Sequence, residues 1–342
     1  MNVVYETVIL ILCCLSLVSC FDPFSIGTGA ALAASYLYQN LKNTVCFFKE
    51  CCTEREIPAN FNRLETSLKE KLYGQNLVHD VVVNALKGHW NGEPTKALTL
   101  SFHGTPGCGK NYVTTFIVES LYAKGSESVH VHNFLGRIHF PLKDKTEEYQ
   151  QKLYQWIKGN VTKCARQIFI FDEVDKIPPK VLNILKPLID YNARIESVDY
   201  RKAVFIFLSN TGGSLIADQF LKLWQLGVRR EDIHLKDFES LMTKGAFNEE
   251  GGFQHSDTIK SNLIDHFVPF LPLEQEHVIE CIRDEYKKRG VQYPSQELID
   301  EILVGVEWGP QPHNLFSKTG CKRLSQKVAL AVQKHGLYKK NN

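Results

Sequence analysis

The sequence predicts an α/β fold, in which a parallel β-sheet is flanked by helices and followed by a small helical domain. Between residues 97 and 208, short apolar runs that suit strands alternate with amphipathic stretches that suit helices. Such alternation is typical of a parallel sheet with helices on its faces. From Leu273 to the end, the strand signals stop and helical periodicity takes over. The chain is therefore expected to consist of a sheet domain and a C-terminal helical lid.

The expected elements follow one another in a regular order. Four apolar runs are predicted to be strands, at residues 97–103, 129–140, 167–171 and 203–208. Helical periodicity starts near Phe61 and recurs at residues 113–122, 277–288 and 296–304. Four strands with helices between them predict one doubly wound domain over residues 61–272, and the lid then covers residues 273–342.

The start of the chain has the pattern of an export signal. An apolar stretch at residues 8–18 is followed by the small residues Ser19 and Cys20, as in a signal peptide cut near Phe21. No Lys or Arg precedes the apolar stretch, so an uncleaved anchor is the alternative. Residues 1–20 are assigned to a signal peptide.

A second apolar segment, residues 24–38, is rich in Gly and Ala and carries no charge. It is shorter than the roughly 20 residues that a helix needs to span a bilayer. It could lie on a membrane surface with Tyr36 and Tyr38 at the level of the headgroups, or it could pack against the protein's own domain. Residues 21–60 are therefore predicted to be a membrane-associating segment and linker.

Charge and cysteine content restrict the class of function. The 342-residue chain has 40 Lys and Arg against 38 Asp and Glu, so it lacks the excess of cations that nucleic-acid binding normally needs. Nucleic acid is not predicted as a partner. Ten cysteines in a chain with an export signal, seven of them after residue 20, indicate an oxidising compartment. The sequence Asn160-Val161-Thr162 predicts N-glycosylation of Asn160, which suits such a compartment.

A glycine-rich loop separates the first predicted strand from a helical pattern. It reads Gly104, Thr105, Pro106, Gly107, Cys108, Gly109, Lys110 and Asn111. Strand, glycine loop and helix form the context of a P-loop, whose backbone N–H groups wrap a polyphosphate. Lys110 would contact the β- and γ-phosphates, and the helix would add its dipole. Asn111 departs from the usual Ser or Thr, but its carbonyl oxygen could bind Mg²⁺ in place of a hydroxyl.

Two adjacent acids, Asp172 and Glu173, end the apolar run 168–171. Because successive side chains of a strand point to opposite faces, the two carboxylates can take separate tasks. Downstream of a P-loop, Asp172 would hold Mg²⁺ and Glu173 would orient the attacking water. If the acid pair stood alone, without a P-loop upstream, the better interpretation would be two solvent-exposed acids at the end of a strand.

Asn210 follows the strand-like run 204–208 and precedes Gly212 and Gly213. Its amide could reach the γ-phosphate region from the neighbouring strand. An ordinary turn residue ahead of the glycines is the alternative, and the spacing alone leaves that choice open.

The P-loop, the acid pair and Asn210 together resemble the Walker A, Walker B and sensor 1 elements of AAA+ ATPases. Within that class the chain resembles the torsins in residues 109–111, 168–173, 207–210, 267–273 and 320–322. The resemblance covers nearly the whole chain. It implies an ATPase of the endoplasmic reticulum lumen and nuclear envelope, which uses ATP and Mg²⁺ for chaperone-like remodelling of membrane-associated protein complexes.

The torsin resemblance implies further site residues. Lys322 would be sensor 2, a lid cation near the γ-phosphate. Cys321 and Cys281 match a torsin cysteine pair that can form a disulfide near the nucleotide, and an inert buried pair is the alternative. Tyr73 and Gly74 belong to a stretch that resembles the adenine-side motif of the related Clp ATPases.

A missing arginine is the most informative departure from the Clp pattern. Clp ATPases carry Asn-Arg-Ile-Asp before the lid, and the arginine reaches into a neighbour's active site, whereas this chain has Leu263 at that place. Such an arginine is worth ~10³–10⁵ in rate in other nucleotidases. A homo-oligomer, which the resemblance implies, should therefore hydrolyse ATP poorly. The resemblance also implies a membrane-anchored luminal activator of the lamina-associated polypeptide type that supplies the arginine in trans.

A different class of function is the main alternative. The protein could be a nucleotide-gated scaffold whose ATP-bound form oligomerises or shapes membrane, with little intrinsic hydrolysis. Asn111, Leu263 and the apolar segment 24–38 all suit that alternative. A kinase or a transporter ATPase explains less, because neither accounts for an export signal together with a helical lid.

Overall fold

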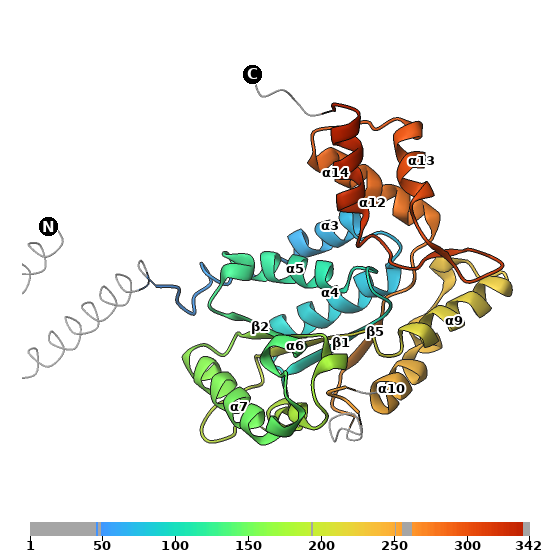
Figure 1. Cartoon of the computed structure of the whole chain (residues 1–342). Helices are drawn as coiled ribbons and strands as arrows, with labels where there is room; N and C mark the ends of the chain where they lie inside the picture. The colour runs from blue at the N-terminus through green and yellow to red at the C-terminus, as the bar shows by residue number, and fades with distance from the viewer. Residues whose placement is uncertain (1–45, 47–48, 193, 250, 255–261, 338–342) are drawn as a thin grey trace, which may run out of the picture. The chain divides into compact units, whose positions relative to one another are not determined.

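The computed structural model describes residues 46, 49–192, 194–249, 251–254 and 262–337. The chain divides into two compact units, Met1–Cys51 and Cys52–Asn342. In the described part of the first unit, Cys46 forms a disulfide with Cys51. The second unit contains all the helices and strands that are labelled in Figure 1.

The predicted signal peptide, residues 1–20, and the apolar segment, residues 24–38, lie outside the described residues. Within the part of the chain that is described, no helix combines the length and the apolar character needed to cross a membrane. The expectations for the N-terminal segments therefore remain predictions.

A five-stranded parallel sheet with the order β2-β3-β4-β1-β5 forms the centre of the second unit. The strands are β1 (Leu98–His103), β2 (Val131–Leu135), β3 (Ile168–Asp172), β4 (Val204–Ser209) and β5 (His266–Pro269). Val204 pairs with both Leu98 and Ile168, so β1, β3 and β4 start level with one another. Their carboxyl ends consequently lie at one edge of the sheet.

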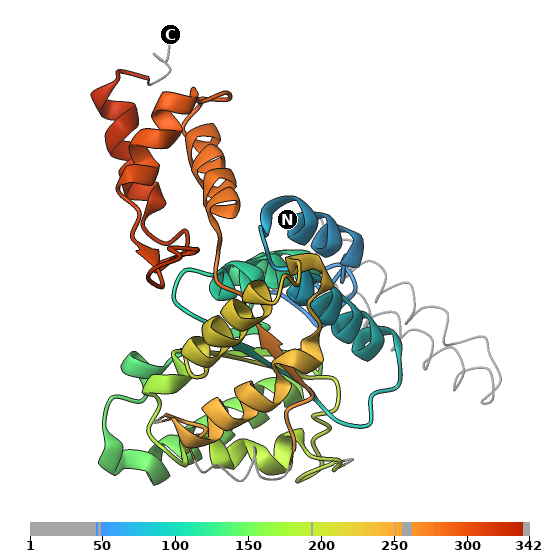
Figure 2. The same cartoon turned by 90° about the vertical axis from the view of Figure 1, so that its right-hand side faces the viewer.

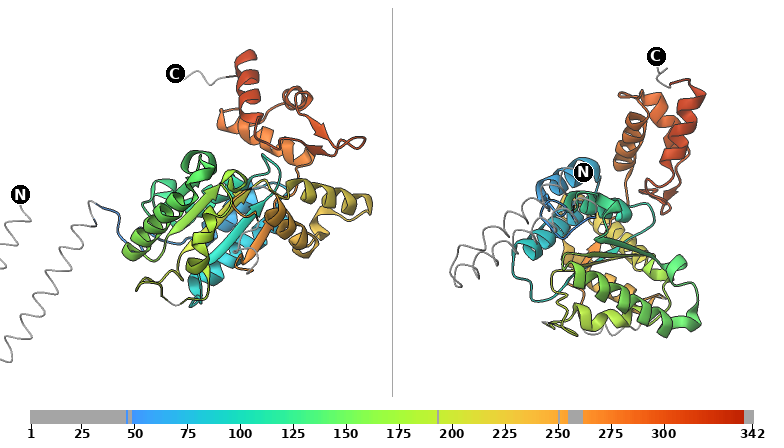
Figure 3. Two further views of the ribbon diagram at one scale, coloured as in Figure 1. Left: turned by 60° about the horizontal axis from the view of Figure 1, so that its bottom comes forward. Right: turned by 90° about the vertical axis from the view of Figure 1, so that its left-hand side faces the viewer.

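Helices cover both faces of this sheet, as Figures 1 and 3 show. One face carries α3 (Phe61–Lys71), α4 (Asn76–Asn91) and α5 (Lys110–Leu121), and the other carries α7 (Thr146–Lys163) and α8 (Lys186–Ile189). The short helix α6 (Gly136–His139) follows β2, and α9 (Gly213–Gln225) packs against α10 (Glu239–Asn248). Short 3-10 turns complete the domain: η2 (Gly125–Glu127), η3 (Lys143–Lys145), η4 (Val174–Lys176), η5 (Val181–Leu185), η6 (Arg230–Asp232) and η7 (Leu235–Asp237).

The side-chain alternation of the strands explains the two-sided packing. In β3, Ile168 and Ile170 join the core under α3, α4 and α5, whereas Phe169 and Phe171 join the core under α7. The rings of Phe171 and Phe207 stack at 5.3 Å across β3 and β4. Strands that are buried on both faces read as continuous apolar runs, because each alternate side chain enters a different core.

The C-terminal part forms the helical lid, seen apart from the sheet in Figure 2. Its helices are α12 (Gln275–Lys288), α13 (Gln296–Val304) and α14 (Leu324–Lys334). They enclose a core of their own, in which Val278, Ile282 and Val328 are fully buried. The lid therefore has the packing of a small separate domain.

Three elements differ from the sequence prediction. β5 was not predicted, since its four residues end in Pro269, and proline suits a strand only at an edge such as this one. The predicted strand 129–140 is shorter, because the chain turns into α6 at Gly136. The lid also contains a two-residue hairpin, β6 (Trp308–Gly309) with β7 (Phe316–Ser317), which is too short to leave a period in the sequence.

A second disulfide joins Cys52 to Cys164 at the end of α7, with 5.4 Å between the Cα atoms. It links residues that are 112 positions apart and so ties the beginning of the second unit to a sheet-covering helix.

Candidate functional site

The glycine-rich loop lies between β1 and α5, at the carboxyl end of β1. Gly104, Gly107 and Gly109 have positive φ angles of 157°, 81° and 108°. Residues other than glycine rarely adopt such angles, because their Cβ atom clashes with the backbone. Gly109 directly precedes α5 in the left-handed conformation. The loop therefore leads its backbone N–H groups toward the helix N-terminus, which is the arrangement that binds phosphate.

Lys110 is the first residue of α5 and is 8% exposed. Its Nζ donates hydrogen bonds to the carbonyl oxygens of Gly104 at 2.6 Å and Thr105 at 3.1 Å. It also donates to Oδ1 of Asn210 at 3.1 Å. The ammonium group thus lies inside the loop and already contacts the residue predicted to act as sensor 1.

Asn111 and Asp172 are joined directly. Nδ2 of Asn111 donates to Oδ2 of Asp172 at 2.6 Å, and Oδ1 of Asp172 accepts from the backbone N–H of Glu173 at 2.7 Å. The bond from Nδ2 leaves the amide oxygen of Asn111 as the atom for a cation. A carboxylate and an amide oxygen are hard donors that fit Mg²⁺, so these two residues could hold the ion.

Glu173 occupies a strained turn directly after β3. Its φ of 53° lies in the left-handed region, where residues other than glycine are uncommon. Its Oε2 lies 3.6 Å from Nε of Arg137, which extends from α6. This turn separates the side chain of Glu173 from that of Asp172, so the two carboxylates take different positions in the site.

Asn210 lies at the end of β4, beside the glycine loop. Its Oδ1 accepts from Lys110, and its Nδ2 lies 3.4 Å from Oδ1 of Asp175. The carbonyl oxygen of the next residue, Thr211, accepts from Nδ1 of His103 at 3.0 Å. Burial lowers the pKa of His103 to about 4, so this imidazole stays neutral and keeps the same donor.

The lid contacts the glycine loop through its backbone. The N–H of Cys321 donates to the carbonyl oxygen of Gly107 at 3.1 Å. A Cβ atom on Gly107 would lie 1.9 Å from the carbonyl oxygen of Thr319, so only glycine permits this approach. Lys322 follows in the same turn, and its side chain is exposed. The predicted sensor 2 is therefore placed against the predicted P-loop.

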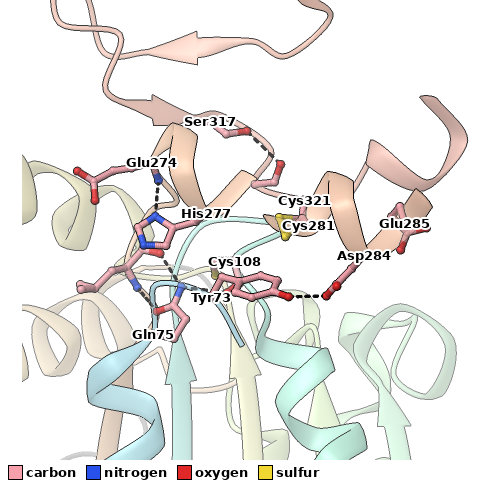
Figure 4. Close-up of a disulfide and its surroundings, with 12 residues drawn as sticks. Tyr73, Gln75, Cys108, Glu274, His277, Cys281, Asp284, Glu285, Ser317 and Cys321 are labelled. Carbon is pink, nitrogen blue, oxygen red and sulfur yellow. Dashed lines mark hydrogen bonds between the residues drawn. A yellow bond between two sulfur atoms is a disulfide. The ribbon is translucent and has the colours of Figure 1, made fainter. Parts of the chain in front are cut away.

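Figure 4 shows the third disulfide, between Cys281 of α12 and Cys321. Its Cα atoms are 6.2 Å apart, and the sequence separation is 40 residues. The backbone of Cys321 is also hydrogen-bonded to Gly107. The disulfide therefore connects helix α12 of the lid to the glycine loop through Cys321. A redox role for this pair remains a prediction.

The adenine-side stretch bridges the sheet domain and the lid (Figure 4). The hydroxyl of Tyr73 donates to Oδ2 of Asp284 in α12 at 2.6 Å, and burial together with this bond raises the pKa of Tyr73. Gly74 is packed beneath His277, and its carbonyl oxygen accepts from Arg230 at 2.6 Å. Gln75, which is buried, donates to the carbonyl oxygens of Cys108 at 3.1 Å and Leu271 at 2.8 Å. These contacts tie the lid hinge to the loop.

The predicted residues converge on a cleft of about 830 Å³ between the sheet domain and the lid. From the predicted set, its walls include Tyr73, Pro106, Gly107, Cys108, Gly109, Lys110, Asn111, Asp172, Glu173, Asn210, Cys281, Cys321 and Lys322. Gly74, Gly104 and Thr105 are not among the lining residues. Their carbonyl oxygens accept hydrogen bonds, from Arg230 at Gly74 and from Lys110 at the other two. Asn160 is elsewhere, half-buried in α7, where its Nδ2 donates to the carbonyl oxygen of Trp156 at 2.8 Å.

Several residues that line the cleft were missed by sequence reasoning. They are Lys71, Leu72, Tyr112, Arg137, Asp175, Lys176, Leu208, Ser209, Leu273, Asp284, Glu285 and Lys288. Asp175 could have been noticed, because it comes soon after the acid pair. Arg137 could not, since it was placed inside a predicted strand, and the lid residues gave no signal of which helical face would meet the cleft.

Leu263 lies in the core and not at the cleft. Its side chain is 4% exposed, and its carbonyl oxygen accepts from Oγ1 of Thr99 at 2.8 Å. It precedes β5, at the end of the sheet opposite the glycine loop. This position contributes packing to the fold and no charge to the site.

Substitution of Asn111 tests the magnesium assignment. We expect Asn111→Ala to weaken Mg²⁺-dependent ATP binding about tenfold, because it removes both the amide oxygen and the bond to Asp172. Binding is measured with a fluorescent ATP analogue in Mg²⁺ and in EDTA. The control Asn111→Thr restores an oxygen ligand and should retain the Mg²⁺ dependence. Equal Mg²⁺ dependence in the alanine variant and the original protein would contradict the assignment.

Reduction of the Cys281–Cys321 bond tests whether the disulfide controls the loop. We expect dithiothreitol to weaken ATP binding by about fivefold, since the turn that contacts Gly107 loses its tether to α12. The variant Cys281→Ser/Cys321→Ser serves as the control, because its affinity should not respond to reductant. Calorimetry on both proteins decides the matter, and an unchanged affinity after confirmed reduction would exclude the coupling.

Comparisons with known proteins agree with the motifs. The torsin family model matches residues 46–171, and the model of the torsin-1A C-terminal domain matches residues 273–330. A torsin-like protein of Drosophila melanogaster is 42% identical over 316 residues, which cover 91% of this chain and 92% of the fly protein. A torsin-like protein of Caenorhabditis elegans is 40% identical over 311 residues, which cover 90% of this chain and 87% of the nematode protein.

Solved structures support the fold. The S. cerevisiae Hsp104–ADP complex matches with a TM-score of 0.55 and 19% identity, covering 85% of this chain and 50% of that chain. A closed state of Hsp104 with ATPγS and FITC-casein matches with a TM-score of 0.56 and 16% identity, covering 81% and 48%. The chain thus spans about half the length of these Hsp104 chains, whose likeness concerns the fold alone. On the family models and the two relatives, this chain belongs to the torsin family.

Proposed function

We propose that this torsin hydrolyses Mg²⁺-ATP in the cleft and uses the cycle to remodel membrane-associated protein complexes. One observation carries the hydrolytic part: Lys110, Asn210 and the Asn111–Asp172 pair meet at the carboxyl ends of three adjacent strands. Mg²⁺, when bound, would neutralise charge on the β- and γ-phosphates. The remodelling part rests on the family.

The chain's own side chains divide the work. Lys110 would transfer its hydrogen bonds from the loop carbonyls to the phosphate oxygens, and Asn210 would contact the γ-phosphate from β4. Glu173 would orient and polarise the attacking water. Its left-handed turn after β3 separates its carboxylate from that of Asp172, so the two acids can take different tasks. Lys322 would add positive charge from the lid side.

We further propose that hydrolysis depends on an arginine from a membrane-anchored luminal activator of the lamina-associated polypeptide type. The burial of Leu263 supports this, because a neighbouring copy in a homo-oligomer would present no cation from that position. An arginine supplied in trans would stabilise charge that develops in the transition state.

Activation is tested with purified protein and candidate luminal domains. We expect ATP hydrolysis near background for the protein alone and a rise of at least about 10²-fold when the right domain is added. The same domain with its arginine changed to alanine should bind without stimulating. Steady-state phosphate release gives the rates. Robust hydrolysis by the protein alone would falsify the dependence on an activator.

Glu173→Gln separates this enzyme from the scaffold alternative. In the assay above it should bind ATP with ordinary affinity, hold the activator and release no phosphate, since the amide is a poor acceptor for the water proton. Introduced into cells that lack the original protein, it should fail to restore function. Full restoration would mean that nucleotide-gated scaffolding is sufficient.

We propose the lumen of the endoplasmic reticulum and nuclear envelope as the location, with residues 24–38 on the membrane surface. Support comes from the disulfides Cys46–Cys51, Cys52–Cys164 and Cys281–Cys321, since such bonds persist in oxidising compartments. The sequence at Asn160 suits the same address.

Glycosidase treatment tests the location. We expect the cellular protein to lose one N-glycan with endoglycosidase H, and Asn160→Gln to lack that shift. The glycosylated protein should sediment with membranes, and deletion of residues 24–38 should release it into the soluble luminal fraction. An unmodified protein in the cytosol would refute the luminal proposal.

A further inference from the structure

We propose that Asp175 is a positioning residue for Asn210, and that it determines which end of the Asn210 amide faces the nucleotide. The inference rests on the proposed ATPase function and assigns a role to an acid outside the motif pair. Asp175 lies in the 3-10 turn η4, directly after Glu173 and Val174, and lines the same cleft.

Asp175 contacts Asn210 at two points. Its Oδ1 accepts from the backbone N–H of Asn210 at 3.2 Å and lies 3.4 Å from the side-chain Nδ2. The side chain of Asp175 is 10% exposed. It therefore contacts both the main chain and the side-chain amide of the residue that directly follows β4.

The two charged neighbours of Asn210 permit only one orientation of its amide. The ammonium of Lys110 can only donate, and it faces Oδ1, whereas an ionised Asp175 can only accept, and it faces Nδ2. Rotating the amide by half a turn would set NH₂ against the ammonium and the carbonyl oxygen against the carboxylate. Both contacts would then be repulsive.

Asp175 is itself held in an ionised, fixed state. Burial alone would raise its pKa, but the hydrogen bonds from Lys176 and from the backbone of Asn210 outweigh burial, and the pKa is lowered. Nζ of Lys176 lies 3.0 Å from Oδ2. The backbone of Gly251 packs so closely that a Cβ atom there would lie 2.8 Å from Cα of Asp175, and Gly252 donates to the carbonyl of Val174 at 2.9 Å.

This arrangement has a consequence for the site. An amide nitrogen carries two hydrogens, and Asp175 engages one side of Nδ2, so the second hydrogen remains as a donor. Fixed in this way, Asn210 would offer the γ-phosphate an N–H group and not a carbonyl oxygen. Lys110, Asn210 and Asp175 then form one hydrogen-bonded chain from the loop after β1, across β4, to the turn after β3.

The test compares matched aspartate-to-asparagine changes. We expect Asp175→Asn, which keeps the side-chain shape, to slow activator-stimulated single-turnover hydrolysis about tenfold while the Kd for a fluorescent ATP analogue stays within about twofold. The control is Asp237→Asn, because Asp237 also accepts a backbone N–H, from His234 at 2.9 Å, but lies outside the cleft lining. It should leave the rate and Kd unchanged. Melting temperatures show whether each variant is folded.

A double-variant cycle supplies the decisive readout. If Asp175 acts through Asn210, the variant Asp175→Asn/Asn210→Ala should hydrolyse ATP no more slowly than Asn210→Ala alone. Additive losses, an unchanged rate in Asp175→Asn, or equal losses of rate and affinity would each overturn the inference. If Asp175→Asn does not fold, the cycle is run with Asp175→Glu, which keeps the charge but shifts the acceptor. Absence of ATP binding by the original protein would instead refute the proposed function.

Discussion

The parallel pairing of β1, β3 and β4 is the constraint on which the site depends. Val204 of β4 pairs with the first residue of β1 and the first residue of β3, so the three strands start level. Their carboxyl ends therefore bring the glycine loop, Asp172 and Asn210 to one edge of the sheet. None of these groups is near another in sequence. In open α/β sheets this edge is where ligands bind, since loops there can vary while the buried strands stay fixed. The chemistry therefore follows from the topology.

Contacts across the cleft convert that edge into a two-domain site. The lid meets the loop by backbone, at Cys321 and Gly107, and by side chain, at Tyr73 and Asp284. Backbone contact with a glycine transmits small displacements directly, because no flexible side chain lies between the partners. Gln75 adds a buried link between the loop and the hinge. The glycine loop and the lid are therefore mechanically connected in this fold.

Lys110, Asp172 and Glu173 each have a polar or charged partner in the site. Lys110 is surrounded by carbonyl oxygens, Asp172 is paired with an amide, and Glu173 faces Arg137 across 3.6 Å. An exposed ion pair of this kind is worth little, about 0–1 kcal/mol, so it can give way when ligand enters. Leu263, where the Clp resemblance predicts an arginine, is packed in the core and brings no cation. This packing agrees with the proposed dependence on an activator that supplies an arginine in trans.

Much of this molecule could be predicted from the sequence, because its chemistry resides in short local patterns. The glycine loop through Lys110, the acids Asp172 and Glu173, and the alternation of strands and helices all depend on neighbours within a few residues, and the fold class and the family were confirmed.

Other features required the tertiary structure. The strand β5 has no period of its own and exists because β1 offers it an edge. The bond between Asn111 and Asp172, the contact of Arg137 with Glu173 and the placement of Asp175 against Asn210 join residues from different strands and turns. The sequence by itself determined which groups are present and the local shapes that carry them. Only the packed sheet and lid decided which of those groups meet, since distances between remote residues are set by the whole core and not by any one segment.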